Sequence, residues 1–281
     1  MEHLNRAPRS GRTLIVAAVL AVIALLVPPW LGGLAAANPS DDDGPQPTIV
    51  LVHGNWADAS SWNDVIERLQ RRGHTVVAPP NLLRGPSTDS AYLASYLQTI
   101  SGPIVLVGHS YGGFPVTDAA TGNAEVKALV YIDAFIPEEG EIPFELAASA
   151  GSCVTLDGLN QVPFEGGLDF YLRWEANMSY PGFTECFANG VGPRDAAVLA
   201  AMQRPAGAGQ VVEAAGPPAW KTIPSWALIG TLDRVIPPEL QEMMSGRAGA
   251  EVSRVRTGHL SLITRPNKVT EVIEAAVEAT T

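Results

Sequence analysis

The stretch GHSYG at residues 108–112 decides the fold of this chain, because it fits the pattern G-x-S-x-G of a serine held on a sharp turn. An apolar run at 103–107 precedes it and is typical of a buried strand, and we expect a helix over 113–120. A side chain at Gly108 or Gly112 would clash where the tight turn brings backbone segments together. The pattern therefore predicts a strand, a turn and a helix that present the Ser110 hydroxyl at the positive end of the helix dipole.

Strands and helices alternate along most of the chain. Apolar runs predict strands at 47–53, 103–107 and 225–230, and three further strands are expected at 75–78, 127–132 and 251–255. Helices are expected at 61–72, from a cap at Ser87 to about residue 100, at 113–120, near 238–247 and at 266–279. This alternation predicts an α/β fold of about six mostly parallel strands with helices on both faces. The linker before the first strand is too short to supply additional leading antiparallel strands.

The N-terminal segment 1–37 has the features of a secretory signal peptide. Three arginines precede an apolar run at 14–27, and small residues at 35–37 offer a cleavage site. An uncleaved membrane anchor is the alternative, because no charge follows the apolar run until Asp41. We therefore expect a secreted or extracytoplasmic protein, or one held on a membrane by this segment. Residues 38–46 are predicted to be a polar linker.

The segment 137–218 also interrupts the alternation of strands and helices, and it is rich in glycine, proline and aromatic side chains. We interpret it as a cap inserted over the edge of the sheet, between core segments 47–136 and 219–281. Most of its aromatic side chains are expected to pack the cap onto the sheet, and a minority to line an apolar pocket. The aromatic residues are Phe144, Phe164, Phe170, Tyr171, Trp174, Tyr180, Phe183 and Phe187.

The two cysteines, Cys153 and Cys186, both lie in this predicted cap. Outside the cytoplasm they can form a disulfide, and two buried free thiols are the alternative. A catalytic cysteine is not expected, because no histidine lies near either one in sequence.

The composition argues against several classes of protein. The 281 residues, 46% hydrophobic and 17% charged, suffice for one α/β domain with an insertion. The net charge is −11 and no basic run occurs, so we predict no nucleic-acid partner. Two cysteines are too few for a zinc site of four thiolates, and no phosphate-binding loop or dinucleotide motif is present. We predict no metal and no cofactor, and leave the oligomeric state open.

A serine hydroxyl needs an adjacent base to become a good nucleophile. His259 is the candidate, because it lies in a loop after the last strand, and strand ends are where open α/β sheets form their sites. Asp233, just after the strand at 225–230, is the candidate carboxylate that fixes the histidine tautomer. Asp133, also at a strand end, is its rival; otherwise it is a loop-capping or pocket-lining carboxylate.

An oxyanion formed at Ser110 would need two backbone donors. The N–H of Tyr111, which follows the serine, is one candidate, and the N–H of Asn55, in the loop after the first strand, is the other. Gly54 lets that loop approach the substrate, because it carries no side chain. His53 and His109 are expected to fix the loops around these groups.

Four stretches resemble motifs of the α/β-hydrolase superfamily: LVHGNWADASSW (51–62), VLVGHSYGG (105–113), GTLDRVIP (230–237) and TGHLSLITRPNKV (257–269). The resemblance covers about 47–136 and 219–281. It is closer to the branch of plant methyl-ester esterases, hydroxynitrile lyases and similar small bacterial hydrolases, in which a six-stranded sheet is the pattern. It implies an α/β-hydrolase fold, Ser110, Asp233 and His259 as catalytic residues, and Asn55 and Tyr111 as donors to the oxyanion.

Hydrolysis of carboxylic esters of small, largely apolar substrates through an acyl-enzyme is the function we expect. Plant lyases of the resembling branch place a lysine beside the catalytic histidine and a threonine in the first loop. Here those positions are Leu260 and Gly54, and both differences favour an esterase. A cofactor-free perhydrolase, a hydroxynitrile lyase and a non-catalytic ligand-binding protein on this scaffold are the alternatives. The rate is expected to rise with pH through one ionisation near ~6–7.

Overall fold

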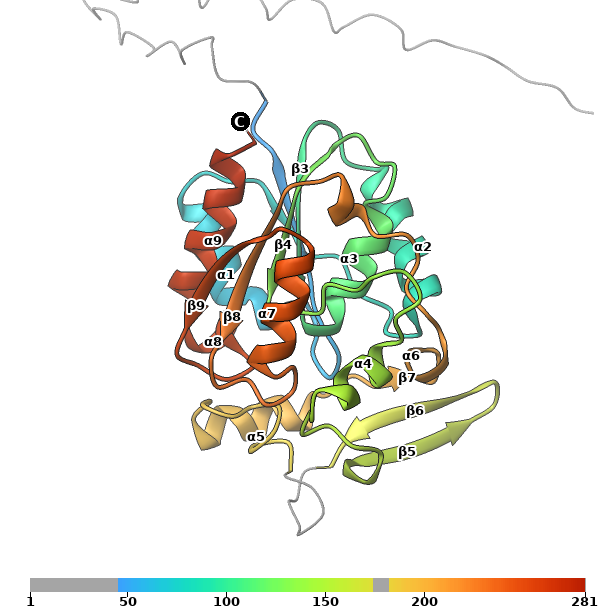
Figure 1. Cartoon of the computed structure of the whole chain (residues 1–281). Helices are drawn as coiled ribbons and strands as arrows, with labels where there is room; N and C mark the ends of the chain where they lie inside the picture. Colours follow the sequence, from blue (N-terminus) through green and yellow to red (C-terminus); the bar gives the residue numbers. More distant parts are fainter. Residues whose placement is uncertain (1–44, 174–181, 281) are drawn as a thin grey trace, which may run out of the picture. The chain divides into compact units, whose positions relative to one another are not determined.

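The computed structural model describes residues 45–173 and 182–280 of the 281-residue chain (Figure 1). The predicted signal peptide, most of the predicted linker, Trp174 and Tyr180 lie outside these residues. Within the described residues, no helix combines the length and the apolar character needed to cross a bilayer.

Six parallel strands form the central sheet, in the order β2-β1-β3-β4-β8-β9. The strands are β1 (Thr48–Val52), β2 (Val76–Val77), β3 (Ile104–His109), β4 (Val126–Ile132), β8 (Ser225–Gly230) and β9 (Glu251–Val255). Strand β3 is buried along its whole length, because helices cover both faces of the sheet. The predicted α/β fold with six strands is confirmed, and in the described residues all six are parallel.

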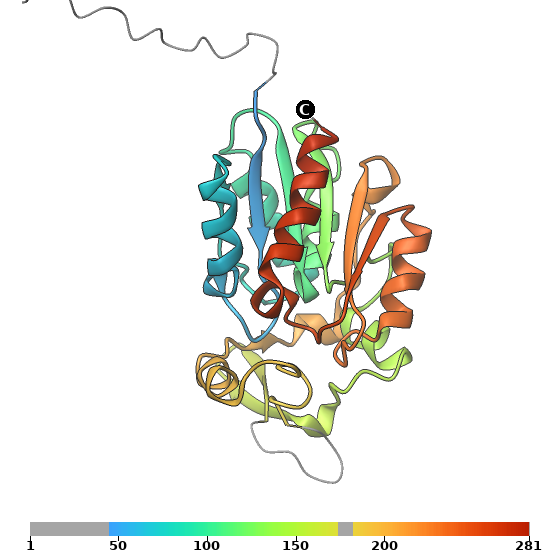
Figure 2. The same cartoon turned by 90° about the vertical axis from the view of Figure 1, so that its left-hand side faces the viewer.

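Helices cover the two faces of this sheet. Helices α1 (Asn63–Arg71) and α9 (Pro266–Glu278) pack together on one face, which is turned toward the viewer in Figure 2. Helices α2 (Pro86–Leu97) and α3 (Gly113–Ala119) pack together on the other face. The remaining helical elements of the core are η1 (Ala59–Trp62), η2 (Ser110–Gly112), η4 (Ala219–Lys221), α7 (Pro238–Arg247) and α8 (Ser261–Thr264).

The start of α2 differs from the prediction. Pro86 occupies the first turn, Gly85 is the N-cap residue, and no side chain caps the helix, so the prediction that Ser87 is the cap is wrong. Proline is suited to this position because it has no N–H to satisfy. The Ser87 N–H and hydroxyl both donate to Oε2 of Glu213, at 3.2 and 2.6 Å, and so join α2 to the segment 137–218.

Most of the described part of the segment predicted to be a cap, 137–218, lies beyond the carboxyl ends of the core strands (Figure 1). Its strands β5 (Leu159–Phe164), β6 (Gly167–Leu172) and β7 (Ala206–Gly207) form a separate antiparallel sheet. Its helical elements are α4 (Pro143–Ser149), η3 (Leu156–Gly158), α5 (Pro193–Ala201) and α6 (Gly209–Val212). Cys153 and Cys186 are joined by a disulfide with a Cα–Cα distance of 5.7 Å.

Candidate active site

Ser110 sits on a strained turn between β3 and α3. Its φ of +56° lies in the left-handed region, which a residue with a side chain rarely adopts. Glycines make this turn possible: a Cβ at Gly108 would lie 2.8 Å from the Gly112 oxygen, and one at Gly112 would lie 2.7 Å from the Val52 oxygen. Gly113, which was not predicted to matter, is equally constrained, because a Cβ there would collide with the Phe135 carbonyl. The turn is therefore held by close backbone packing on several sides.

The structure brings Ser110, His259 and Asp233 together in one hydrogen-bonded chain. His259 Nε2 lies 2.8 Å from Ser110 Oγ, and His259 Nδ1 lies 2.8 Å from Asp233 Oδ2. Since a carboxylate accepts, Nδ1 carries the proton that it donates to Asp233, which leaves Nε2 free to accept from the serine hydroxyl. All three residues are buried. This geometry suits removal of a proton from the serine by the imidazole.

Asp233 is held by several donors besides His259. The Val235 and Ile236 N–H groups donate to its Oδ1 at 2.8 and 3.0 Å, and the Gln241 side-chain amide donates to its Oδ2 at 2.8 Å. The carboxylate therefore has a fixed orientation, which in turn fixes the plane of the imidazole ring.

Asp133, the rival carboxylate, is used differently. Its two oxygens accept from the backbone N–H groups of Gly230 at 2.8 Å and Ser261 at 3.0 Å. It therefore connects the end of β8, which precedes the loop of Asp233, to the start of α8, which follows the loop of His259. This geometry matches the loop-capping interpretation, and it is Asp233 that the structure places against the imidazole.

Burial shifts the ionisation of these groups. Loss of hydration lowers the pKa of His259 from 6.5 to about 3, so the imidazole is neutral and able to accept a proton at neutral pH. Burial raises the pKa of Asp133 well above its usual range, and the neighbouring Asp233 raises it further. The lowered pKa of His259 moves the acid limb of the pH–activity profile below pH 6–7, the range expected from the sequence.

The loop after β1 abuts the serine. A Cβ at Gly54 would lie 2.6 Å from Ser110 Cβ, so glycine is what allows the close approach. The N–H groups of Asn55 and Tyr111 have no hydrogen-bond acceptor among the described residues, and both residues line the same pocket as Ser110. Two unpaired N–H groups beside the Ser110 hydroxyl suit the binding of an oxyanion.

His53 and His109 hold the loops, as expected from the sequence. His53 Nδ1 lies 3.0 Å from the Gly54 oxygen, and His53 Nε2 accepts the Asn81 N–H at 3.0 Å. His109 Nε2 lies 3.0 Å from the backbone oxygen of His259. The first histidine therefore fixes the loop of Asn55, and the second fixes the backbone of the catalytic base candidate.

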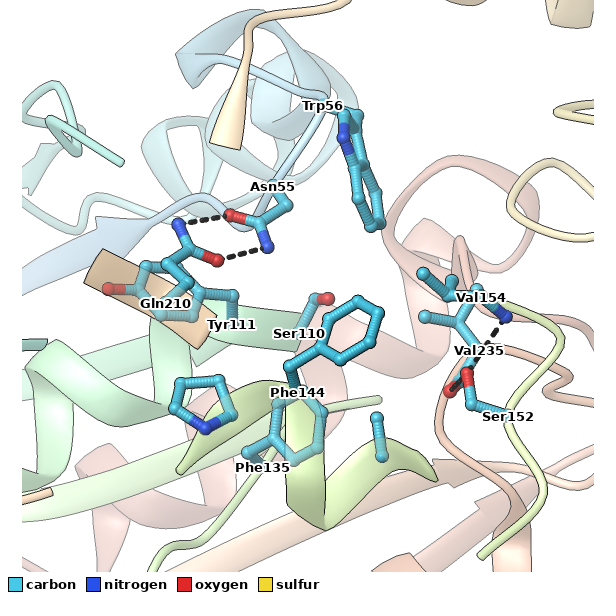
Figure 3. A pocket seen from close by; sticks show the side chains of 12 residues that line it. Asn55, Trp56, Ser110, Tyr111, Phe135, Phe144, Ser152, Val154, Gln210 and Val235 are labelled. Atoms are coloured by element: carbon cyan, nitrogen blue, oxygen red, sulfur yellow. Dashed lines mark hydrogen bonds between the residues drawn. The ribbon is translucent and has the colours of Figure 1, made fainter. Parts of the chain in front are cut away.

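A pocket opens beside Ser110 (Figure 3). Of the cap aromatics, Phe144 lines it, whereas Phe183 and Phe187 are buried and Phe164 is half-exposed. None of its lining residues carries a charge. The described lining residues are Asn55, Trp56, Ser110, Tyr111, Phe135, Pro143, Phe144, Ala147, Ser152, Val154, Gln210 and Val235. Such a surface favours an uncharged, apolar ligand.

An aromatic side chain from the cap covers the imidazole. The ring of Phe187 meets the rings of His259 and Trp56 edge-on, at centroid distances of 5.3 and 5.6 Å. Its neighbour Cys186 is fixed to Cys153, whose N–H donates to the Arg234 oxygen at 2.8 Å. The disulfide therefore connects the segment of Phe187 to the loop of Asp233.

Among residues 45–173 and 182–280, no group of three metal-binding side chains is present.

Residues 49–272 match the Alpha/beta hydrolase family, and the chain belongs to this family. It is 34% identical over 106 residues to a carbendazim hydrolyzing esterase of Nocardioides sp. (strain SG-4G), covering 33% of this chain and 44% of that protein. It is 27% identical over 126 residues to an alpha-hydroxynitrile lyase of Arabidopsis thaliana, covering 37% and 49%. The chain thus aligns with about half the length of these two relatives.

A longer alignment joins the chain to methylesterase 10 of Arabidopsis thaliana, with 22% identity over 260 residues, 80% of this chain and 90% of that protein. Among solved structures, polyneuridine aldehyde esterase matches with a TM-score of 0.65 and 19% identity, covering 82% of this chain and 99% of that one. A pyrethroid hydrolase from Sphingobium faniae JZ-2 matches with a TM-score of 0.64 and 18% identity, covering 83% and 98%. These structural matches confirm the fold.

Proposed function

We propose that the chain is a serine hydrolase that cleaves uncharged carboxylic esters of small, largely apolar substrates through an acyl-enzyme. The observation that carries the proposal is the hydrogen-bonded chain from Ser110 through His259 to Asp233, which opens into an uncharged pocket. Relatives and similar structures named as esterases support hydrolysis of an ester bond.

The first half of the reaction follows from the positions of the groups. Ser110 Oγ attacks the ester carbonyl carbon while its proton passes to His259 Nε2. The carbonyl oxygen becomes an oxyanion that accepts from the N–H groups of Asn55 and Tyr111. As the tetrahedral intermediate collapses, the bond to the alcohol oxygen breaks, and that oxygen takes the proton from His259. The acyl group remains on Ser110.

Water completes the reaction. His259 removes a proton from water, the hydroxide attacks the acyl carbon, and the Ser110 oxygen leaves with the proton returned by His259. Asp233 keeps the imidazole in one tautomer and stabilises its protonated form in both halves. No step requires a metal or a redox group.

Cyanohydrin cleavage, the activity in the name of one relative, is the alternative to test. Leu260, which follows His259, is buried and offers no ammonium group to a departing cyanide. Gly54 offers no hydroxyl near Ser110. The absence of an ammonium group and of a hydroxyl at these two positions therefore favours the ester over the cyanohydrin.

The test is hydrolysis of 4-nitrophenyl butanoate by the wild type, by Ser110→Ala and by the control Ser95→Ala, which changes an exposed serine on α2. We expect Ser110→Ala to lose roughly 10⁴–10⁶ in kcat and Ser95→Ala to keep the wild-type rate. More than a tenth of wild-type activity in Ser110→Ala would overturn the proposal. Faster release of cyanide from mandelonitrile than hydrolysis of any ester would favour the lyase.

We further propose that the protein acts outside the cytoplasm. The signal-like segment 1–37 and the Cys153–Cys186 disulfide support this location, since disulfides persist in oxidising compartments. The intact mass of protein exported by its host tests it: a chain that starts near Asn38 is expected. A chain that keeps Met1 and stays on the membrane would instead support the anchor.

A further inference from the structure

Two amide side chains pair across the wall of the pocket. Asn55 Nδ2 donates to Gln210 Oε1 at 2.5 Å, and Gln210 Nε2 donates to Asn55 Oδ1 at 2.8 Å. Asn55 comes from the loop after β1, whereas Gln210 comes from α6 in the predicted cap (Figure 3). Gln210 is buried, with 4% of its surface exposed. The pair therefore links the loop that carries an oxyanion donor to the segment that covers it.

A third group fixes the direction of this pair. Gln210 Nε2 also donates to the backbone oxygen of Leu83 at 3.3 Å. A carbonyl oxygen can only accept, so the nitrogen of Gln210 must face Leu83, and its oxygen must face Asn55. Asn55 consequently presents its nitrogen to Gln210 Oε1. Turning both amides over would set the Gln210 oxygen against the Leu83 oxygen.

The orientation leaves one hydrogen of Asn55 unused. The Asn55 amide nitrogen carries two hydrogens, and among the described residues its one acceptor is Gln210 Oε1. Both hydrogens of Gln210 Nε2 are engaged. In Figure 3 the nitrogen of Asn55 lies on the side of the pair that faces Ser110. A free N–H therefore lies in the wall of the pocket that contains the nucleophile.

Other polar side chains of the wall are already satisfied. The Ser152 hydroxyl donates to the Val235 oxygen at 2.6 Å and accepts the Val154 N–H at 3.1 Å. The Trp56 indole donates to the Phe170 oxygen at 3.2 Å, and the Tyr111 hydroxyl donates to Asp89 at 2.7 Å. Apart from Ser110, the Asn55 amide is the lining side chain of the described residues that keeps a donor for a ligand.

We propose that the Asn55 side chain is a specificity-determining donor, which binds an uncharged oxygen or nitrogen acceptor of the substrate close to the scissile carbonyl. Gln210 is the positioning residue that holds it. This inference rests on the proposed ester hydrolysis and names its substrate class: esters with an ether, carbonyl or ring-nitrogen acceptor within a few atoms of the ester carbon. A purely alkyl ester would leave the donor unpaired in an apolar wall, which costs binding.

Two pairs of esters test the preference, because the members of each pair differ by one oxygen in place of a methylene. The 4-nitrophenyl esters of butanoic and methoxyacetic acid form the first pair, and those of pentanoic and 3-methoxypropanoic acid the second. For each pair, the kcat/KM of the ether ester is divided by the kcat/KM of the alkyl ester. This ratio is then compared between each variant and the wild type. The intrinsic reactivities of the esters cancel in this comparison.

Asn55→Leu keeps the backbone N–H and the approximate shape but removes the amide, and Gln210→Met removes its partner. We expect either variant to lower the ratio about fivefold to tenfold for at least one pair, which is the scale of one hydrogen bond. The double variant is expected to lower it no further, because both changes remove one unit. Ser87→Ala is the matched control: it removes the hydroxyl's hydrogen bond to Glu213 just beyond α6, outside the pocket, and should leave the ratio unchanged.

The outcomes separate the two proposals. If the wild type hydrolyses all four esters in a Ser110-dependent way but Asn55→Leu leaves both ratios unchanged, this inference is overturned and the proposed function stands. Equal losses on ether and alkyl esters would also overturn it, because they would indicate a damaged oxyanion loop. If the wild type hydrolyses none of the four esters, the proposed function itself has failed.

Discussion

The core sheet and the segment 137–218 contribute different things to the site. The carboxyl edge of the sheet supplies Ser110, Asp233 and His259, which follow β3, β8 and β9 and are themselves buried. The segment 137–218 supplies Phe144, Gln210 and other groups that line or cover the pocket. The hydrogen-bonded chain of Ser110, His259 and Asp233 is therefore built at strand ends, where open α/β sheets form their sites, whereas the core and the insertion both line the pocket beside it.

The largest expected effect lies in the core. Asp233→Asn should lower kcat by about 10⁴, because an amide cannot hold the imidazole in the required tautomer. Asp133→Asn is the matched change on the neighbouring strand. It should cost far less activity while lowering the melting temperature, since an amide nitrogen would face one of two backbone N–H groups. Comparing kcat and melting temperature for both variants checks this, and the reverse ranking would give the acid role to Asp133.

The next effect concerns the segment 137–218. Replacing Cys153 and Cys186 together by serine releases a loop of 34 residues, which is expected to lower the free energy of unfolding by about 3–4 kcal/mol. Activity should fall by much less than in Asp233→Asn, because the reacting groups stay on the core. Urea unfolding and esterase rates measured on the same protein check this. A variant as inactive as Asp233→Asn yet fully folded would show that the division between the two regions is wrong.

A smaller effect is expected where the two regions meet. Asp118 on α3 accepts the Gly216 N–H at 3.0 Å, and burial raises its pKa from 3.8 to about 6. A carboxyl with a raised folded pKa stabilises the fold below pH 3.8, and this contribution is lost as pH rises through 6. Asp118→Asn should therefore raise the free energy of unfolding at pH 7.5 by roughly 1–3 kcal/mol. Chemical unfolding at pH 7.5 and pH 3.5 checks this; an equal gain at both pH values would contradict it.

The smallest expected effect is that of pH on catalysis. Because burial lowers the pKa of His259 to about 3, its base form is fully populated from pH 6 to 8. The kcat/KM for an ester stable in this range should change by less than about twofold, with any acid limb below pH 6. A pH profile measured with 4-nitrophenyl butanoate, corrected for ionisation of the product, checks it. A limb between pH 6 and 7 would show that the imidazole is less buried in solution.

The core was predictable because its signals are local. Buried parallel strands are short apolar runs, and the sequence GHSYG carries its own steric reason for a turn. The positions of Ser110, Asp233 and His259 at strand ends followed from the same periodicity, and the structure brings these three side chains into contact. The error at Ser87 was a helix start, where a proline at the first position replaced the expected cap.

The insertion was less predictable, because its order depends on contacts that are distant in sequence. The hairpin of β5 and β6 was not predicted: Pro163 and mostly exposed residues hide the strand pattern. A usable signal was Glu165-Gly166, a two-residue turn in which Gly166 has a φ of +93°. Gln210 had no signal at all, because its partner Asn55 lies 155 residues away. The role of Asp133 as a bridge likewise appears only with the folded loops.

The central claim, that Ser110 carries the acyl group, is tested most directly by labelling the activated serine with a phosphonyl group that takes the place of the acyl group. A neutral fluorophosphonate ester reacts with an activated serine and leaves a stable adduct that intact mass and peptide mass spectrometry can locate. We predict one adduct per chain, on the peptide that contains Ser110. Ser110→Ala should form no adduct, and Asp233→Asn should form it more slowly than the wild type. An adduct on another residue of active wild-type protein, or turnover of esters that persists when Ser110 is fully modified, would contradict it.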